Sequence, residues 1–475
     1  MSGAPDSPIG WLQAQAGDAP DTPAIRDARG TLSYGALWHA LGNWHREFGR
    51  EGLTPGRIAA VLTSDRSRLV RAVWLALYSG CPVMPLDPQR PATHGLINEL
   101  GVEQVFTDPG VMPPGGRARR LPVERLDEMP EGTPSPPSPA AASEPQLLIT
   151  TSGTEGAAKA VMLSGAGLMA SADASCRLFD LGRGDTWLCS LPVIHVGGLM
   201  ILLRCACAGA TVELDERFDP AAVWDSLCGG VTHTSLSPVM LNCIMDAAGD
   251  APVPANLRHV LTGGSAMPPG IARRAAAMNW PVTETYGMSE TATHIAIVEP
   301  ESRALRPIDG GQVDLAGGGM ETDTVAPVRL AGPMLMLGYA NANLRPGDGL
   351  DEAGGLVSTD LGRRSEDGHI RIVGRRDDVI ICGGLNIHPV EVEQLLAGCP
   401  GLTEAAVTSQ PDPVWGQQLV MLYTGDDDPE GVAAWAAANL PGRFRPRIIR
   451  RLASLPKNPL GKLQRDRLPA LAAGQ

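Results

Sequence analysis

The chain contains 475 residues, of which 43% are hydrophobic and 19% are charged, and its formal net charge at pH 7 is −13. A chain of this length exceeds what one hydrophobic core usually supports, so we expect two or more domains. The negative charge argues against nonspecific binding to nucleic acid or to a membrane surface, because such binding needs a basic face. Any anionic ligand must therefore be held by a local site.

Targeting signals and paired cysteines are not evident in the sequence. The N-terminal segment MSGAPDSPIGWLQ lacks the basic flank and the apolar core of a secretory signal. No stretch approaches the roughly 18 apolar residues of a membrane span. Only Cys205 and Cys207 of the nine cysteines lie close together, so their spacing indicates neither a disulfide framework nor a zinc site. We expect reduced thiols in a cytoplasmic protein.

The first part of the chain alternates between strand-like and helix-like periods. Strands are expected at residues 56–65, 81–87 and 103–108, with helices at residues 66–80 and 92–101 between them. This alternation is typical of a parallel sheet with crossover helices. A run rich in Pro, Gly and Ser then extends from Pro113 to Pro145, where we expect a flexible surface connection.

The alternation resumes after this run and changes character near Asp360. Further strands are expected at residues 146–150, 185–192, 210–214, 231–236 and 257–262, separated by helical segments. Short polar strands at residues 368–381 then lead into a helix at residues 389–398. The predicted fold is α/β, with a large N-terminal body of several sheets and crossover helices at residues 1–374. A small, mobile α+β domain follows at residues 375–475.

A hydroxyl-rich glycine loop, TTSGTEGAAK, joins two of the predicted strands. Its glycines let backbone N–H groups converge on phosphate oxygens, and its Thr and Ser side chains add hydroxyl donors. It ends on Lys159, one of only three lysines among 39 basic residues, the others being Lys457 and Lys462. A lysine supplies a compact, mobile charge that can follow a departing pyrophosphate. The alternative interpretation is a hairpin that binds no ligand.

Six segments resemble, in order, the motifs of the adenylate-forming superfamily, which contains acyl-CoA synthetases, adenylation domains of peptide synthetases and luciferases. They are TSGTEGAAKAV, LTGGSAMP, ETYGMSET, STDLG, GRRDDVIICGGLNIHPVEVE and PKNPLGKLQR. The resemblance implies an AMP-forming acid–CoA ligase that uses ATP and Mg²⁺, adenylates a carboxylic acid and then forms a thioester with coenzyme A.

The resemblance also implies which residues bind ATP and the metal. The ATP-binding residues would be Thr151, Ser152, Gly153, Thr154, Gly156, Lys159, Gly263, Gly264, Ser265, Tyr286, Gly287, Ser289, Asp360 and Arg375. Tyr286 would stack on the adenine, and Asp360 would hold the ribose hydroxyls with help from Arg375. Glu290 would be the magnesium ligand, which agrees with the preference of Mg²⁺ for one or two carboxylates plus phosphate oxygens.

The C-terminal motifs imply a mobile domain with a catalytic lysine. Asp377 would be the hinge, and Gly383 and Gly384 would line the tunnel for the pantetheine arm of coenzyme A. Lys462 would reach the α-phosphate and the carboxylate, because two anions must meet and a single ammonium can bridge them. The same lysine must withdraw before coenzyme A attacks, which rotation of a small domain allows. The alternative for Lys462 is a surface lysine in a basic tail.

The segment SLPVIHVGGLMILLRCACAGATV bears on the identity of the acid. Acyl-CoA and aryl-CoA ligases have a His at the position of His195, at the mouth of the acyl pocket, which makes it a catalytic and acyl-binding candidate. Arg204 is the only charge in the apolar helix that follows, so it is a candidate to bind a second carboxylate of the substrate. The spacing most resembles o-succinylbenzoate–CoA ligases of menaquinone synthesis. The alternatives are a structural histidine and an arginine that snorkels to the surface.

Two other functions remain open. The chain could load its acyl group onto the thiol of a separate carrier protein, since it contains no carrier domain of its own. It could instead be a non-catalytic adenylate-binding relative, because Glu155 places a carboxylate in the phosphate loop where the family usually has Thr. The exact acid and the oligomeric state, including a homodimer, are also left open by the sequence.

Overall fold

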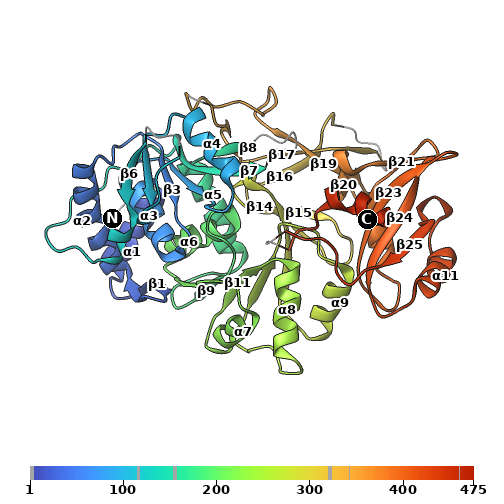
Figure 1. Ribbon diagram of the computed structural model, residues 1–475. Coiled ribbons are helices and arrows are strands. Elements are labelled where there is room, and N and C mark those ends of the chain that lie inside the picture. The colour runs from blue at the N-terminus through green and yellow to red at the C-terminus, as the bar shows by residue number, and fades with distance from the viewer. Residues whose placement is uncertain are drawn as a thin grey trace.

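The computed structural model describes residues 5–114, 118–152, 158–318, 324–341, 343–458 and 461–474. In Figure 1 the body lies to the left and centre of the view, and a smaller C-terminal unit lies to the right. The chain combines helices with several sheets, which confirms the predicted α/β class. None of the helices in these ranges is both long and apolar enough to cross a bilayer.

Seven strands of the described residues form the sheet that carries the glycine loop, in the order β18-β8-β7-β4-β3-β5-β6. Their bounds are β3 (Ala59–Leu62), β4 (Val83–Leu86), β5 (Gln104–Thr107), β6 (Arg119–Pro122), β7 (Pro145–Ser152), β8 (Ala158–Ser164) and β18 (Gly338–Tyr339). Strands β3 to β7 pair in parallel, whereas β8 lies antiparallel to both β7 and β18. The crossover helices α3 (Arg66–Tyr78) and α4 (Pro91–Glu99) occupy the predicted places.

A second sheet of thirteen strands in the described ranges runs in the order β16-β17-β19-β20-β15-β14-β13-β12-β11-β9-β10-β1-β2. The strands are β1 (Pro23–Asp27), β2 (Gly30–Ser33), β9 (Thr186–Cys189), β10 (Thr211–Leu214), β11 (His233–Leu236), β12 (His259–Thr262), β13 (Val282–Gly287), β14 (His294–Val298), β15 (Leu305–Pro307), β16 (Gln312–Leu315), β17 (Val325–Ala331), β19 (Leu356–Arg364) and β20 (Ile370–Arg375). Its segment from β1 to β13 is parallel, and every pairing beyond β13 is antiparallel.

Helices cover these sheets, and polar caps set several of their ends. The remaining helices of the body are α1 (Pro8–Asp18), α2 (Tyr34–Glu51), α5 (Gly165–Leu178), α6 (Val196–Ala208), α7 (Pro220–Cys228), α8 (Pro238–Ala248) and α9 (Pro269–Ala277), with the short helices η1 (Val123–Asp127) and η2 (Ser289–Thr291). Asp65 caps α3 and Ser237 caps α8, each accepting a hydrogen bond from a backbone N–H of the first turn. Helix α6 ends at Gly209, whose left-handed backbone satisfies a free carbonyl.

The C-terminal unit has cores of its own. It contains β21 (Ile380–Cys382), β22 (Leu385–Ile387), β23 (Leu402–Asp412), β24 (Gly416–Gly425), β25 (Ile448–Arg451), α10 (Pro389–Leu396), α11 (Pro429–Asn439), α12 (Leu468–Ala472) and the short helices η3 (Arg376–Asp378), η4 (Gly442–Phe444) and η5 (Arg465–Arg467). The buried apolar side chains of three clusters all lie at or before Ile370 in the sequence, and those of two further clusters all lie at or after Ile380. The predicted division at residue 374 falls between these two positions and stays a prediction.

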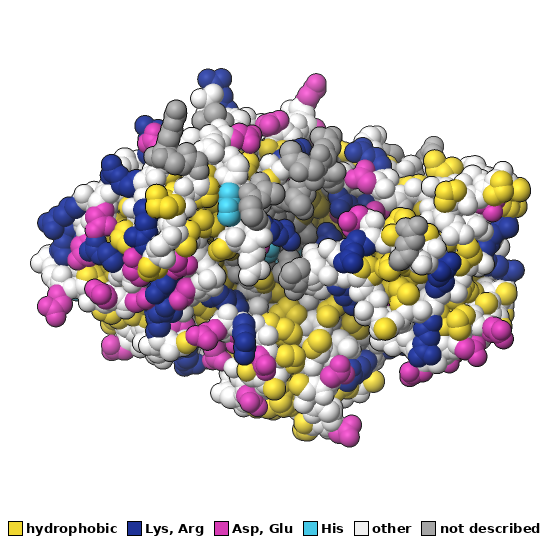
Figure 2. Space-filling model, in the orientation of Figure 1, with side chains coloured by type: hydrophobic (Ala, Val, Ile, Leu, Met, Phe, Trp, Pro, Cys, Tyr) yellow, Lys and Arg dark blue, Asp and Glu magenta, His cyan; other side chains and the backbone are white. Residues whose placement is uncertain are grey.

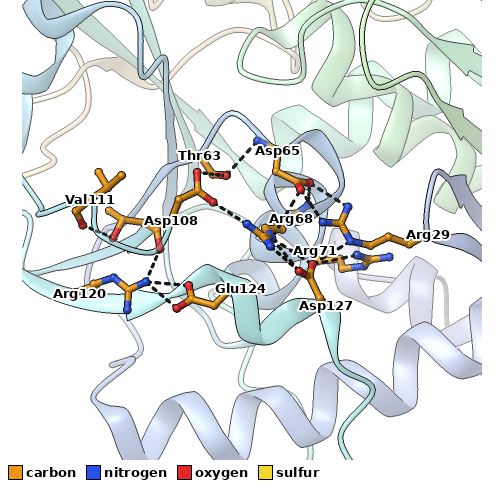
Figure 3. Close-up of polar contacts among 11 residues, drawn as sticks. Arg29, Thr63, Asp65, Arg68, Arg71, Asp108, Val111, Arg120, Glu124 and Asp127 are labelled. Carbon is orange, nitrogen blue, oxygen red and sulfur yellow. Dashed lines mark hydrogen bonds and ion pairs between the residues drawn. The ribbon is translucent and has the colours of Figure 1, made fainter.

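The prediction of a flexible surface connection from Pro113 to Pro145 is wrong for residues 119–127, whereas residues 128–144 form no helix or strand and are all partly or fully exposed. Residues Arg119–Pro122 form edge strand β6, and Leu121, Val123 and Leu126 are almost completely buried. Asp127 accepts hydrogen bonds from Arg68 of α3 and pairs with Arg29 (Figure 3). Later in the run, Ser135 accepts a hydrogen bond from Tyr78 through its carbonyl. Proline restricts the backbone torsion φ and so limits the flexibility of the chain. A Pro-rich composition is therefore compatible with the packed segment at residues 119–127.

Candidate active site

The candidate site draws on the turns that follow β12 and β13, on β8 and β19, and on the C-terminal unit. Figure 2 shows the surface hollowed between the body and the C-terminal unit, with Lys and Arg side chains at the edge of the hollow. Ligands of α/β proteins commonly bind at the carboxyl ends of parallel strands, where such loops gather.

Tyr286, Asp360 and Arg375 form one connected group. The Tyr286 hydroxyl donates to Asp360 Oδ2 at 2.8 Å. Asp360 of β19 and Arg375 of β20 are paired residues in the sheet, and Arg375 Nε lies 3.7 Å from Asp360 Oδ1. Arg375 Nη2 also donates to Thr359 Oγ1 at 2.7 Å. Burial and the Asp360 carboxylate raise the pKa of Tyr286, so the phenol stays a neutral donor.

The turn after β12 lies beside this group. A side chain at Gly263 would meet Thr285 Oγ1 at 2.7 Å, and that hydroxyl donates to the Thr262 carbonyl. Gly264 has φ of +81°, and Ser265 is half-buried next to it. The turn therefore presents backbone at short range to the strand that carries Tyr286. A residue with a side chain at either glycine would be strained or would collide.

Glu290 and Lys159 come together around Tyr339. Glu290 and Ser289 belong to η2, directly after β13, and Gly287 before them leaves no room for a side chain because the Thr293 carbonyl lies too close. The Tyr339 hydroxyl donates to Glu290 Oε1 at 2.8 Å, and Lys159 Nζ lies 5.2 Å from the centre of the Tyr339 ring. One carboxylate with phosphate oxygens suits Mg²⁺, and no cluster of three acidic, His or Cys ligands occurs among the described residues.

The glycine loop connects two strands, as predicted, and the structure shows that these strands are antiparallel. Thr151 of β7 faces Lys159 of β8 in the register of this pair. The candidate residues Gly153, Thr154 and Gly156 lie outside the described part of the chain, as do Glu155 and the side chain of Ser152.

Lys462 belongs to the C-terminal unit, yet it lies within electrostatic range of Asp360 and Arg375 of the body. Its loop lies against the body, because a side chain at Gly461 would meet Val239 Cβ at 2.9 Å and Ser237 Oγ at 3.2 Å at the start of α8. The surrounding protein lowers the pKa of Lys462, and the charge of Arg375 lowers it further, whereas Asp360 raises it. The side chain nevertheless keeps contact with solvent.

The loop of Lys462 is also tied to the predicted hinge. Arg465 Nη2 donates to Glu393 Oε2 at 2.7 Å, and Arg465 Nε lies 3.5 Å from Asp378 Oδ2. Asp378 follows Asp377, which is exposed in η3 between the two units. This connection couples the position of the lysine loop to the segment that would turn.

Gly383 and Gly384 lie away from the ATP residues, in the exposed turn of the β21–β22 hairpin. Both have positive φ, of +58° and +78°, which a two-residue hairpin turn requires. A cavity of about 570 Å³ opens between β17 and β19 of the body and β22, α10 and η4 of the C-terminal unit. Arg363, Arg376, Arg443, Asn386 and His388 contribute to its lining.

His195 occupies the position before the first residue of α6, makes no capping hydrogen bond through its side chain and is half-buried. Its pKa is lowered mainly by burial and also by Arg90, whereas Asp87 raises it, so the neutral ring is favoured near pH 7. None of the described residues makes a hydrogen bond to its ring in the present arrangement. A structural histidine would be expected to have such a partner.

Arg204 is 2% exposed, so the alternative of an arginine that snorkels to the surface is wrong. Its Nη2 donates to Thr293 Oγ1 at 2.8 Å and lies 3.5 Å from His294 Nδ1, and its guanidinium lies 5.2 Å from the centre of the Trp187 ring. No carboxylate of the described residues pairs with it, and its Nε has no hydrogen-bond partner there. Burial lowers the pKa of Arg204 to about 10.

Tyr339, Thr359 and Thr293 were not among the sequence candidates. Tyr339 and Thr293 reach their partners through the folded chain, and no local pattern marks them. Thr359 had a signal, because it directly precedes Asp360 in the STDLG motif.

Comparison with known proteins identifies the family of the chain. The chain matches the AMP-binding enzyme family over residues 12–340 and the AMP-binding enzyme C-terminal domain over residues 391–462. The 2-succinylbenzoate–CoA ligase of Oceanobacillus iheyensis is 28% identical over 480 residues, covering 96% of this chain and 98% of the relative. The sulfoacetate–CoA ligase of Cupriavidus necator is 30% identical over 506 residues, covering 98% of this chain and 97% of the relative.

Solved structures share the fold. The o-succinylbenzoate CoA synthetase of Bacillus subtilis, solved with its acyl-adenylate intermediate, has a TM-score of 0.84 and 24% identity over 98% of each chain. ATP-bound MatB of Rhodopseudomonas palustris has a TM-score of 0.88 and 21% identity over 98% of this chain and 99% of MatB. The chain therefore belongs to the AMP-binding enzyme family, which confirms the resemblance read from its motifs and the predicted class of an AMP-forming acid–CoA ligase.

Proposed function

We propose that this enzyme adenylates an acid that carries a second anionic group, with 2-succinylbenzoate as the first candidate, and transfers the acyl group to coenzyme A. The observation that supports the adenylation step is that the loop of Lys462, from the C-terminal unit, packs against the start of α8 and brings the lysine within electrostatic range of Asp360 and Arg375 of the body. A cation beside the polar groups of Tyr286 and Asp360 would offset the repulsion between two approaching anions.

In the first half-reaction an oxygen of the substrate carboxylate attacks the α-phosphorus of ATP. A new O–P bond forms, the bond between the α-phosphorus and the bridging oxygen breaks, and pyrophosphate leaves with its electron pair. Lys462 would neutralise the carboxylate and the α-phosphate as they meet, and Lys159 would accompany the pyrophosphate. Glu290 would hold Mg²⁺, which neutralises phosphate charge when bound. Tyr286 and Asp360 would position the nucleoside.

In the second half-reaction the thiol of coenzyme A attacks the acyl carbon, its proton is lost to solvent, and AMP leaves. Gly383 and Gly384 offer bare backbone for the pantetheine arm once the unit has turned. The 570 Å³ cavity has Arg363, Arg376 and Arg443 in its lining together with Glu391, which pairs with Arg363, and its remaining positive charge would suit the nucleotide phosphates of coenzyme A. These features favour coenzyme A over a carrier-protein thiol, which remains the alternative acceptor.

The choice of acid rests on Arg204. The acids named for the two relatives, 2-succinylbenzoate and sulfoacetate, both carry a second anionic group. A buried guanidinium without a carboxylate partner is costly unless a charged ligand completes it. A role in menaquinone synthesis follows only if 2-succinylbenzoate is the acid.

ATP–pyrophosphate exchange with 2-succinylbenzoate, sulfoacetate and benzoate tests the proposal. We expect exchange with an acid that carries two anionic groups, and an acyl-CoA product by mass spectrometry when coenzyme A is added. A product formed only with a phosphopantetheinylated carrier protein would favour the alternative acceptor. Absence of exchange with every acid would favour the alternative that the chain is a non-catalytic adenylate-binding protein, which Glu155 in the phosphate loop suggests.

Replacing Arg204 tests the anionic subsite. We expect Arg204→Met to raise the KM for the two-anion acid about 100-fold and to change the KM for benzoate little, because a buried charged hydrogen bond is lost. Met preserves much of the volume and the contact with Trp187. An equal change for both acids would show that Arg204 only supports the surrounding packing.

Two further expectations extend the proposal. The enzyme would act in the cytoplasm, which agrees with nine free cysteines, five of them buried. A homodimer remains an option that light scattering on the purified protein decides.

A further inference from the structure

The segment Met336–Ala340 bridges the two halves of the phosphate and metal region. Met336 N donates to the Glu290 carbonyl at 2.7 Å, so the segment is tied to η2. Leu337 N donates to Met162 O at 2.8 Å and Ala340 N donates to Ala160 O at 2.7 Å, which ties it to β8 just after Lys159. The backbone of this segment therefore fixes the distance between Glu290 and the glycine-loop strand.

The Tyr339 ring is held firmly within that bridge. Gly349 packs against the ring, because a side chain there would approach Tyr339 to 2.6 Å. Tyr339 N donates to Asp348 O at 2.9 Å on the side away from β8. With the ring fixed, its hydroxyl donates to Glu290 Oε1 at 2.8 Å. Lys159 Nζ lies over the ring, 5.2 Å from its centre.

We propose that Tyr339 is a positioning residue that orients the Glu290 carboxylate toward Mg²⁺ and holds Lys159 beside the triphosphate. This inference rests on the proposed function. The phenol has one proton to donate and uses one acceptor site of Oε1, so Glu290 Oε2 and the remaining lone pair of Oε1 stay available to a cation. Carboxylates that bind metals are commonly oriented by such hydrogen bonds. The ring attracts the Lys159 ammonium through its π face.

The hydroxyl and the ring can be separated by two substitutions. Tyr339→Phe removes only the donor to Glu290, whereas Tyr339→Leu removes the donor and the ring under Lys159. The measurement is the affinity for α,β-methylene-ATP, determined by calorimetry at a series of Mg²⁺ concentrations. This analogue cannot release pyrophosphate, so it binds without reacting. We expect Tyr339→Phe to require about tenfold more Mg²⁺ for the same nucleotide affinity. Tyr339→Leu should in addition weaken binding at saturating Mg²⁺.

Two further variants separate positioning from general destabilisation. Tyr78→Phe removes another hydroxyl of the body, one that donates to Ser135 O at 2.6 Å, and should leave the Mg²⁺ requirement unchanged. In a Glu290→Gln background, Tyr339→Phe should cause no further loss, because the carboxylate it acts on is gone.

The outcomes distinguish this inference from the function on which it rests. A Tyr339→Phe enzyme with the wild-type Mg²⁺ requirement, or with a lower one, would overturn the positioning role while leaving the ligase assignment intact. A lower requirement would mean that the hydroxyl competes with the cation for Glu290. Absence of Mg²⁺-dependent nucleotide binding in the wild-type protein would overturn the proposed function and the role of Tyr339 together.

Discussion

Asp127 provides a direct test of the packed segment at residues 119–127. Its carboxylate accepts hydrogen bonds from Arg68 Nη2 at 2.6 Å and from Arg68 Nε at 3.0 Å, and it pairs with Arg29 Nε at 3.0 Å (Figure 3). The side chains of Asp127 and Arg68 are 29% and 20% exposed, so solvent screens these pairs only in part. Asp127→Ala removes the contacts while Leu121 and Leu126 keep their apolar burial.

The expected cost follows from these contacts. Hydrogen bonds to charged groups are worth about 1.5–3 kcal/mol, and exposed ion pairs contribute about 1 kcal/mol or less. For a partly screened carboxylate with three arginine partners, Arg29, Arg68 and the more distant Arg71 at 3.9 Å, we expect the local free energy of opening to fall by about 2 kcal/mol. That value corresponds to about a 30-fold increase in the open population of the segment.

Hydrogen–deuterium exchange of the amides in residues 119–127 measures this population. The Arg119 N–H, which donates to Glu103 O at 2.7 Å, is a suitable reporter of the β5–β6 pairing. Asp309→Ala is the matched control, because Asp309 forms its 2.6 Å pair with Arg177 at the surface, where the two side chains are 70% and 55% exposed. Equal protection in the two variants would refute the argument that Asp127 anchors the segment.

The remaining predictions concern catalysis. Lys462→Ala should slow adenylation at least about 100-fold while thioester formation from supplied acyl-adenylate continues, as coupled assays of each half-reaction would show; equal loss in both would contradict a lysine that serves one state. Because the pKa of Lys462 is lowered, its ammonium loses its proton at a lower pH than that of an ordinary lysine. The rate of adenylation should therefore begin to fall at a pH below the usual pKa of lysine. This fall should disappear in Lys462→Arg, because a guanidinium keeps its proton throughout this range. Arg66→Met should raise the KM for the acid more than it lowers kcat, because Arg66 Nη2 donates to the carbonyls of Cys189 and Leu191 at 2.7 Å and so holds the loop that leads to His195; an unchanged KM in a folded variant would contradict this.

Local patterns predicted a large share of the fold. The strands and helices between residues 56 and 108 follow from alternating periods of apolar side chains, and they appear at the expected places. The strand-to-strand setting of the glycine loop was also visible, because apolar runs flank it on both sides. Composition alone misled at residues 119–127, where an edge strand of four residues with one buried leucine is too short to form a clear pattern.

The candidate site divides in the same way. Contiguous motifs identified four of the candidates, namely Tyr286, Glu290, Asp360 and Lys462. The structure places Tyr286 and Asp360 in a hydrogen bond. Tyr339 was not predicted, because its partners Glu290 and Lys159 are distant in sequence and no motif surrounds it.

By itself, the amino-acid sequence determined the α/β class, the order of the elements and the family, because apolar periodicity and short motifs are properties of neighbouring residues. Only the tertiary structure decided that Arg204 is enclosed without a carboxylate, that Tyr339 connects Lys159 to Glu290, and that the Lys462 loop rests on α8. These relations depend on how distant segments pack, and packing is set by the shape of the whole core rather than by any local stretch.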